Sequence, residues 1–353
     1  MDDPEKILLD QIRKNRSPSV QYAIFNKDSL IKSYAFGYVD IENQIKADRA
    51  TTYNAYSVTK TFTALAILQL SEFSKLRIED PIKDYLSDFP YNPKITIKQV
   101  LTHSAGIPNP MPLAWIHLSS ETEAFDRDEF FKKILAKHKN TIANPDEKFT
   151  YSNLGYVIFG KLIEKVSGFK YEDYIQNKII GPLGIRKSEM GFEIHDTTSH
   201  ATGYQKKYSL TNAILGLLID KSKYMSKSGP GWKPFKPFYV NGPSYGGLIG
   251  TREAFIKYIQ ELLQPECKLI TDDSRKILFT ENKTLEGRPT GMCLSWFKGY
   301  LTGHEYFTHA GGGGGYYCEI RVYPRLNKGS VVFFNRTGMS DQRFLDQIDK
   351  FYL

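Results

Sequence analysis

A serine and a lysine stand three residues apart at the start of an apolar run, NAYSVTKTFTALAILQL, at residues 54–70. Residues three apart share one face of a helix, so a helix here would place Ser57 beside Lys60. A lysine held among apolar side chains loses its proton more easily, and the free amine can then take the serine's proton. The N–H groups at the helix start would favour the negative charge that forms on an attacked carbonyl. The alternative is a helix-capping serine and a lysine that extends to solvent.

The Ser-x-x-Lys spacing is weak alone, because it occurs four times in this chain. Ser29 falls in the turn of a predicted hairpin, and Ser167 lies beside a glycine that would end a helix. Ser295 falls in a strand-like run, where an offset of three points two side chains to opposite faces. Because Ser57 opens an apolar helix, it is the predicted nucleophile, and Lys60 is its predicted base.

Two further segments carry side chains suited to the same chemistry. In FTYSNLGYVIFG, Tyr151 and Asn153 precede a second apolar helix. A tyrosine near a cation can act as a phenolate or a proton donor, and an asparagine can orient a substrate amide or the lysine. In THAGGGGGYY, His309 stands at the expected end of a strand, and glycines 311–315 would let a substrate backbone approach. The alternative for this segment is a flexible turn beside a structural histidine.

In this order and spacing the three segments resemble the serine β-lactamase and penicillin-binding-protein superfamily. The resemblance is greatest to the class C β-lactamase branch, which includes D-Ala-D-Ala carboxypeptidases, D-aminopeptidases and carboxylesterases. The segments VLTHSAGIP, GPLGI and SYGGLIGTREAFIKYI extend it over most of the chain. The implied catalytic roles are nucleophile for Ser57, activating base for Lys60 and proton shuttle for Tyr151. The implied binding groups are Asn153, His309, Ala310 and Gly311, with an oxyanion hole from the backbone N–H groups of Ser57 and Gly312. His103 in VLTHSAGIP is interpreted as structural.

The third segment departs from the family pattern, because it reads His309-Ala310-Gly311 where the family has Lys-Thr-Gly. Ala310 offers no hydroxyl, and a neutral histidine is a weaker partner for a carboxylate than a lysine. We therefore expect an esterase or amidase that works through an acyl-enzyme, ahead of a D-Ala-D-Ala carboxypeptidase and of a true β-lactamase. A sensor that captures a penicillin or peptide without turnover is the alternative from another class.

The remaining pattern indicates how these residues are positioned. Helices are predicted over residues 3–16, from Asn153 until Gly168 ends the helix, and over 340–353, with a hairpin over 19–40 and β-type runs between 291 and 338. We predict an α+β fold in which both chain ends form one antiparallel sheet covered by helices. The predicted units are a sheet domain, residues 1–75 and 242–353, and a mainly helical inserted domain, residues 76–241.

The amino-acid composition limits the kinds of partner and compartment that can be expected for this chain. The 353 residues carry a net charge of +8, but lysines are interleaved with acids, so we expect a small ester, amide or short peptide substrate and no nucleic acid. No apolar stretch reaches the roughly 20 residues that cross a bilayer, and the charged N-terminus lacks a secretory signal. A cytoplasmic protein is expected if this N-terminus is the native one. Neither the three cysteines nor the pair His195 and His200 predicts a metal site, and no cofactor is expected.

One segment differs from the rest in composition. Residues 221–240 carry five lysines and no acid, mixed with aromatic residues and prolines. The segment is either a solvated linker or a flap over the site whose lysines contact an anionic substrate. The five lysines are Lys221, Lys223, Lys227, Lys233 and Lys236.

Overall fold

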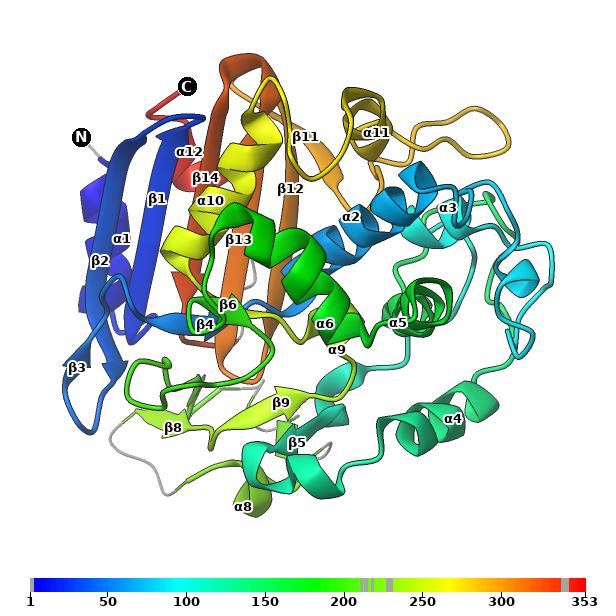
Figure 1. Cartoon of the computed structure of the whole chain (residues 1–353). Coiled ribbons are helices and arrows are strands. Elements are labelled where there is room, and N and C mark those ends of the chain that lie inside the picture. Colours follow the sequence, from blue (N-terminus) through cyan, green and yellow to red (C-terminus); the bar gives the residue numbers. More distant parts are fainter. Residues whose placement is uncertain (1–2, 210–211, 213–214, 217–218, 227–230, 338–342) are drawn as a thin grey trace.

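The computed structural model describes residues 3–209, 212, 215–216, 219–226, 231–337 and 343–353. Its centre is a seven-stranded antiparallel sheet in the order β11-β12-β13-β14-β1-β2-β3 (Figure 1). The two chain ends meet in this sheet where β1 pairs with β14, which confirms the predicted α+β class. The strands are β1 (Ser19–Asn26), β2 (Leu30–Asp40), β3 (Ile45–Lys46), β11 (Phe297–Leu301), β12 (His304–Gly313), β13 (Tyr316–Tyr323) and β14 (Lys328–Phe334).

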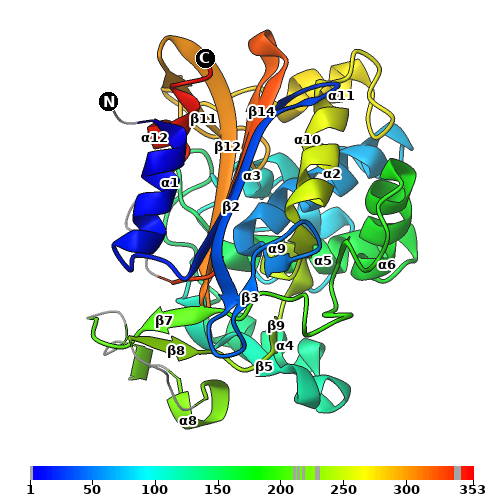
Figure 2. The ribbon, with the colours of Figure 1, turned by 90° about the vertical axis from the view of Figure 1, so that its left-hand side faces the viewer.

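Helices cover both faces of the sheet (Figure 2). The terminal helices α1 (Pro4–Arg13) and α12 (Asp346–Asp349) lie on one face, and α2 (Thr59–Glu72) and α10 (Arg252–Leu263) lie on the other. Side chains alternate along β1, so Tyr22 belongs to the core under the terminal helices, whereas Phe25 belongs to the larger core. Strands buried on both faces have no solvent-facing positions, which explains the continuous apolar runs at residues 22–25 of β1 and 331–334 of β14.

Helix α2 runs through the larger core and is buried on every side from Thr59 to Leu70. Apart from Lys60 and Gln69, its buried side chains are apolar or small, which is the pattern of a helix with no solvent face. Phe62 stacks on Tyr258 of α10 with ring centroids 4.0 Å apart, and Thr63 contacts the Tyr171 hydroxyl at 2.7 Å. This packing places residues 59–70 of the helix, including Lys60, away from water.

The segment between residues 76 and 241 contains both helices and short strands. Its helix α5 ends at Gly168, whose left-handed φ of 77° confirms the predicted stop. The larger core includes residues from both predicted units, such as Leu65 and Leu162, and the division at 75 and 242 stays a prediction. The other elements are α3 (Ile97–Leu101), α4 (Arg127–Lys137), α5 (Asn153–Ser167), α6 (Tyr171–Ile175), α8 (Lys221–Tyr224), α9 (Pro243–Gly246), α11 (Asp272–Leu278), β4 (Thr52–Asn54), β5 (Ile116–Leu118), β6 (Met190–Gly191), β7 (Tyr204–Lys206), β8 (Trp232–Pro234), β9 (Phe238–Val240) and β10 (Ile249–Thr251).

Three local predictions differ from the structure. Ser295 precedes β11 in a left-handed turn with φ of 66°, so the alternation of strand side chains does not apply to it. His309 lies inside β12 and not at its end, because pairing with β13 continues through the glycines to Gly313. The closing helix is short within the described residues, spanning Asp346–Asp349, and residues 340–342 lie outside them.

Candidate active site

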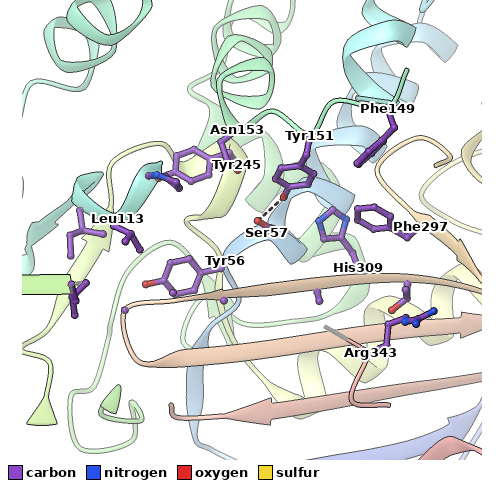
Figure 3. Close-up of a pocket in the computed structure, with 18 of the residues that line it drawn as sticks. Tyr56, Ser57, Leu113, Phe149, Tyr151, Asn153, Tyr245, Phe297, His309 and Arg343 are labelled. Carbon is purple, nitrogen blue, oxygen red and sulfur yellow. Dashed lines mark hydrogen bonds between the residues drawn. The ribbon is translucent and has the colours of Figure 1, made fainter. Parts of the chain in front are cut away.

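Ser57 lies in a tight 3₁₀ turn, η1 (Tyr56–Val58), that leads directly into α2. Tyr56 has a left-handed φ of 45°, a strained conformation for a bulky residue. The turn is fixed from one side by a hydrogen bond from the Ala55 N–H to the Leu248 carbonyl. This sharp entry into the helix leaves Ser57 half-buried in the wall of a cavity of about 680 Å³ (Figure 3).

Lys60 lies directly behind Ser57 and is fully buried. Its Nζ is 3.0 Å from Ser57 Oγ, 2.8 Å from Asn153 Oδ1 and 2.7 Å from the Tyr245 carbonyl oxygen. Burial lowers the pKa of Lys60 well below its usual value of 10.5. None of the ion pairs among the described residues involves Lys60, so no carboxylate offsets this effect.

These three contacts also determine what a neutral Lys60 amine can do. An amine has two N–H groups and one lone pair. The oxygens of Asn153 and Tyr245 can only accept hydrogen bonds, so they take the two N–H groups. The lone pair is then left for the Ser57 hydroxyl, 3.0 Å away. The geometry therefore suits removal of the Ser57 proton by Lys60.

The Tyr151 hydroxyl reaches Ser57 from the other side and donates to Ser57 Oγ at 2.9 Å. Burial raises the pKa of Tyr151 well above 10, so the phenol keeps its proton at neutral pH. Of the two roles open to this tyrosine in the sequence, the geometry favours proton donor. His103 stacks on the Tyr151 ring with centroids 4.3 Å apart and accepts from the Ser152 N–H, which agrees with the structural role expected for this histidine.

Asn153 holds Lys60 through a side-chain amide whose orientation is fixed. Its Nδ2 and its backbone N–H donate to Asn109 Oδ1 at 3.1 and 3.0 Å, which leaves Oδ1 pointing at Lys60. Ser152, the N-cap of α5, accepts from the Gly155 N–H and anchors this turn. Asn153 also lines the cavity, so the same side chain can contact Lys60 and a substrate.

His309 lines the cavity as a neutral histidine. Burial, with a smaller effect from Lys60, lowers its pKa to about 3. Its Nδ1 lies 2.5 Å from the Ser295 carbonyl, an oxygen that can only accept, so Nδ1 carries the hydrogen and Nε2 has the free lone pair. The third segment therefore presents a hydrogen-bond acceptor where a lysine would present a donor, and Ala310 beside it presents a methyl group.

The glycines after Ala310 have distinct surroundings. A Cβ on Gly311 would lie 2.2 Å from the Ala55 carbonyl and 2.7 Å from Ser57 N, so this glycine lets β12 touch the nucleophile turn and does not itself line the cavity. Gly312 lines the cavity. A two-residue turn at Gly314 and Gly315 makes the Gly313–Tyr316 pair the hydrogen-bonded one, so the Gly312 N–H points away from β13.

That N–H faces an open strand edge. Pairing of β11 with β12 stops at Phe297 and Thr308, so among the described residues no strand pairs with β12 on that side beyond Thr308. The open edge packs against η1 instead, which brings the N–H groups of Gly312 and Ser57 to the same wall. This is the arrangement that an oxyanion hole requires.

The structure thus gathers Ser57, Tyr151, Asn153, His309, Ala310 and Gly312 around one cavity and places Lys60 and Gly311 behind its wall. Sequence reasoning missed Asn109, the Tyr245 carbonyl, Tyr56 and the cavity-lining pair Phe149 and Phe297. Tyr245 contacts Lys60 through its backbone carbonyl, which any residue type would supply. The residue type at this position therefore could not have indicated the contact. Asn109 is exposed and lies between two prolines in IPNPMP, so the sequence carries no signal of its contact with Asn153.

The lysine-rich segment is only partly a flap. It contains α8, β8 and β9, and Lys227 lies in residues 227–230, outside the described residues. Phe235 lines the cavity, whereas Lys221, Lys223, Lys233 and Lys236 do not. Lys223 instead pairs with Glu121 at 2.8 Å. Of this segment, an aromatic side chain and not one of these four lysines contributes to the site.

A comparison with protein families decides the relationship suggested by this geometry. A model of the Beta-lactamase family matches residues 6–351. The chain belongs to the Beta-lactamase family. This confirms the predicted superfamily. Penicillin-binding protein 4* of Bacillus subtilis (strain 168) is 30% identical over 318 residues, which cover 87% of this chain and 66% of that protein. Protein flp of Staphylococcus aureus (strain N315) is 27% identical over 260 residues, 69% of this chain and 50% of that protein.

This family member spans about half the length of the first of its curated relatives. Among solved structures, the octameric penicillin-binding protein homologue from Pyrococcus abyssi has a TM-score of 0.75 and 24% identity, covering 94% of this chain and 72% of that one. The D-amino acid amidase from Ochrobactrum anthropi SV3, complexed with D-phenylalanine, has a TM-score of 0.76 and 17% identity, covering 98% and 94%. At these identities the likeness shows a shared fold.

The described residues offer neither a membrane-spanning helix nor a metal site. Across that part of the chain, no helix combines the length and apolarity needed to cross a membrane. The same residues contain no group of three His, Cys, Asp or Glu side chains that could hold a metal ion. His200 instead contacts Thr52 and Tyr316 through its two ring nitrogens.

Proposed function

We propose that this Beta-lactamase-family chain is a serine hydrolase that cleaves an ester or amide through an acyl-enzyme on Ser57. The observation that carries the proposal is the buried Lys60 amine, whose hydrogens are occupied by Asn153 and Tyr245 and whose lone pair faces Ser57. A lysine that only capped or filled the helix would not need three fixed polar contacts and a depressed pKa.

The steps follow from the positions of these groups. Lys60 takes the Ser57 proton as Oγ attacks the substrate carbonyl, and the N–H groups of Ser57 and Gly312 stabilise the oxyanion. The bond to the leaving group then breaks, Tyr151 gives its proton to the departing oxygen or nitrogen, and the proton on Lys60 restores the phenol. Water attacks the acyl-enzyme by the reverse path, releasing the acid and restoring Ser57.

The neutral His309 supports an esterase or amidase above a D-Ala-D-Ala carboxypeptidase or a β-lactamase. Its Nε2 accepts hydrogen bonds and cannot donate one to a carboxylate at neutral pH. The D-amino acid amidase and a D-stereospecific amidohydrolase from Streptomyces share the fold, which makes D-amino acid amides a reasonable part of any substrate panel. The cytoplasmic location stays a prediction.

Intact-mass measurement and turnover test this proposal together. A fluorophosphonate probe should add once, on Ser57, and Ser57→Ala should lose labelling and hydrolysis of p-nitrophenyl acetate together. D-amino acid amides and penicillins should be tested as substrates in the same way. A single burst of product without turnover on every member would indicate the sensor alternative. Labelling of Ser29, Ser167 or Ser295 would contradict the assignment of the nucleophile.

The pH profile provides a second test. Burial lowers the pKa of Lys60, so kcat/KM for a neutral ester should rise with pH and then level off. The midpoint of that rise should lie below pH 10.5. The rate rises with pH because Lys60 can accept the Ser57 proton only after it has lost its own. The profile should be measured with a substrate that has no titrating group of its own. A midpoint at or above 10.5 would contradict Lys60 as the base.

A further inference from the structure

A second hollow lies on the other side of one wall of the Ser57 cavity. The strands β5 and β9 pair in a two-stranded ribbon (Figure 1). One face of this ribbon carries Ile116, which lines the Ser57 cavity. The opposite face carries His117 and Tyr239, which line a separate groove of about 1070 Å³. We propose that this groove is a docking site for an extended, lysine- or arginine-rich peptide segment of a partner protein.

The polar floor of the groove follows from the alternation of strand side chains. Phe238 and Val240 belong to the larger core, so Tyr239 and Asn241 face the other way and line the groove. His117 stands opposite Tyr239 in the ladder and therefore lies on the same face. Three polar or aromatic side chains thus form one continuous surface, fixed by the backbone pairing beneath them.

Asn241 carries a hydrogen-bond donor that the protein leaves unused. The residue is 2% exposed, and its Oδ1 accepts from His117 Nδ1 at 2.8 Å. Its Nδ2 donates to none of the described residues, although the side chain lines the groove. The Tyr239 hydroxyl accepts from the Ile194 N–H at 3.1 Å, and within the described chain its own hydrogen has no acceptor. Polar groups of such buried residues normally have partners, so the floor of the groove is suited to a ligand that supplies acceptors.

The two donors are spaced like the acceptors of a peptide backbone. Tyr239 and Asn241 are two residues apart, and the ladder continues to Asn241 because its N–H donates to the Trp115 carbonyl at 2.9 Å. Positions two apart on a strand recur at about 6.6 Å, and so do the carbonyl groups on one edge of an extended peptide. A peptide in this conformation can therefore meet both donors.

The rim of the groove is acidic, although the chain as a whole is basic. Seven carboxylate side chains line the groove against three lysine or arginine side chains, whereas the whole chain carries a net charge of +8. Phe125 stacks on His117 with ring centroids 4.3 Å apart, a surface that suits the long stems and cationic ends of basic side chains. A basic peptide is thus attracted to this groove and repelled by the rest of the molecule. Four of the carboxylates form no ion pair with any described residue: Glu123, Asp126, Asp173 and Glu193.

Calorimetric titration with unlabelled peptides tests the groove without using turnover. The probes are peptides of about nine residues in which glycine alternates with lysine, glutamine or glutamate. The lysine peptide should bind one to one and at least about tenfold more tightly than the glutamine peptide, and the glutamate peptide should not bind. This preference should shrink several-fold between about 50 and about 500 mM salt, because the unpaired carboxylates are exposed. Spermine, a polycation without carbonyl groups, should compete at least about tenfold more weakly than the lysine peptide.

Variants should assign the binding to the groove. Asp173→Asn combined with Glu193→Gln should raise the Kd of the lysine peptide about 3- to 10-fold at low salt only. Tyr239→Phe removes a donor and should raise the Kd of the lysine and glutamine peptides by a similar factor, about 3- to 10-fold, at either salt concentration. Glu79→Gln combined with Asp88→Asn removes two exposed carboxylates outside the groove and should bind as the wild type does. Thermal unfolding checks that each variant is folded.

Each contrary result overturns a defined part of the proposal. No binding of the lysine peptide, or equal weakening by the groove pair and the control pair, would overturn the docking site. Spermine that competes as well as the lysine peptide would overturn recognition of a peptide backbone. Protein with a fluorophosphonate on Ser57, or Ser57→Ala, should bind the lysine peptide unchanged. Loss of binding there would place the peptide in the Ser57 cavity. Failure of the hydrolase function would appear separately, as an absence of turnover with peptide binding intact.

Discussion

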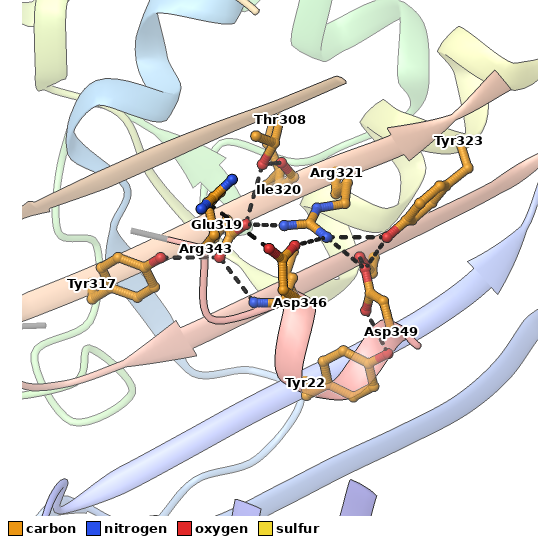
Figure 4. Close-up of polar contacts among 12 residues, drawn as sticks. Tyr22, Thr308, Tyr317, Glu319, Ile320, Arg321, Tyr323, Arg343, Asp346 and Asp349 are labelled. Atoms are coloured by element: carbon orange, nitrogen blue, oxygen red, sulfur yellow. Dashed lines mark hydrogen bonds and ion pairs between the residues drawn. The ribbon is translucent and has the colours of Figure 1, made fainter. Parts of the chain in front are cut away.

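Two basic side chains among the described residues, Lys60 and Arg321, are completely buried, but their surroundings are opposite. Lys60 contacts neutral oxygens and lies 5.1–5.4 Å from the centres of three tyrosine rings. Arg321 contacts the carboxylates of Glu319, Asp346 and Asp349 at 2.8, 2.7 and 3.8 Å (Figure 4). One cation is surrounded by dipoles, and the other is surrounded by countercharges.

The difference sets their protonation in opposite directions. Burial lowers the pKa of Lys60, and nothing in its contacts restores it. Burial also opposes the charge on Arg321, but Glu319 and Asp349 outweigh it and raise the pKa well above its usual value. A buried amine without a carboxylate partner loses its proton easily and can act as a base. A buried cation that is paired with carboxylates stays charged and links the elements that carry them. Lys60 therefore suits proton transfer, and Arg321 suits attachment of α12 to β13.

The largest effect is expected where Lys60 is made a permanent cation. Lys60→Arg introduces a guanidinium that cannot lose its proton, so kcat/KM for p-nitrophenyl acetate should fall about 10³- to 10⁶-fold, as in Ser57→Ala. Active-site titration should normalise the rates, and Lys132→Arg, an exposed lysine, is the control. A Lys60→Arg enzyme that retains a tenth of the activity would show that Lys60 acts only as a charge.

Removal of the second group on Ser57 should have a smaller effect. Tyr151→Phe deletes the hydroxyl that donates to Ser57 Oγ, so kcat/KM should fall about 10²- to 10⁴-fold, the usual contribution of a positioned acid. Tyr171→Phe removes a fully buried hydroxyl that contacts Thr63, away from the cavity, and should leave the rate within a few-fold. Full activity in Tyr151→Phe would mean that Lys60 carries every proton by itself.

The two cations should separate most clearly in stability. Arg321→Met leaves Glu319 and Asp349 buried without their partner, so the free energy of unfolding should drop by about 3–5 kcal/mol. Lys60→Met removes an amine that has no countercharge and leaves two carbonyl oxygens unpaired, so the change should stay below about 2 kcal/mol. Urea unfolding of both variants measures this. Equal losses would contradict the distinction drawn between the two sites.

The smallest effect concerns the pH dependence of the same network. Burial, partly offset by Arg321, raises the pKa of Glu319 from 4.5 to about 7. The folded chain binds this proton more tightly than the unfolded chain does, so the wild type should lose stability as pH rises from about 4.5 to 7. Glu319→Gln lacks this dependence and should gain about 1–3 kcal/mol relative to the wild type between pH 5 and 8. A constant difference between the two proteins would show that Glu319 is ionised throughout.

Much of the fold was predictable because its signals are local. The hairpin over residues 19–40 follows from strand-forming runs around a polar turn, and Gly168 ends α5 because a left-handed residue is needed there. Ser295 was misplaced because a left-handed turn at a non-glycine residue leaves no local signal. The short strands β5, β8 and β9 were not predicted, since strands of three residues depend on their partners.

The sequence by itself determined the pair Ser57 and Lys60, because residues three apart on one helix must lie together whatever surrounds them. It also placed Tyr151 and Asn153 at the start of a second helix. Tertiary structure alone decided that Lys60 has no carboxylate partner among the described residues, that His309 is a neutral acceptor and that Arg343 reaches the cavity. Charge state and long-range contacts depend on which segments pack together, and burial by distant parts of the chain, which no spacing encodes, sets them both.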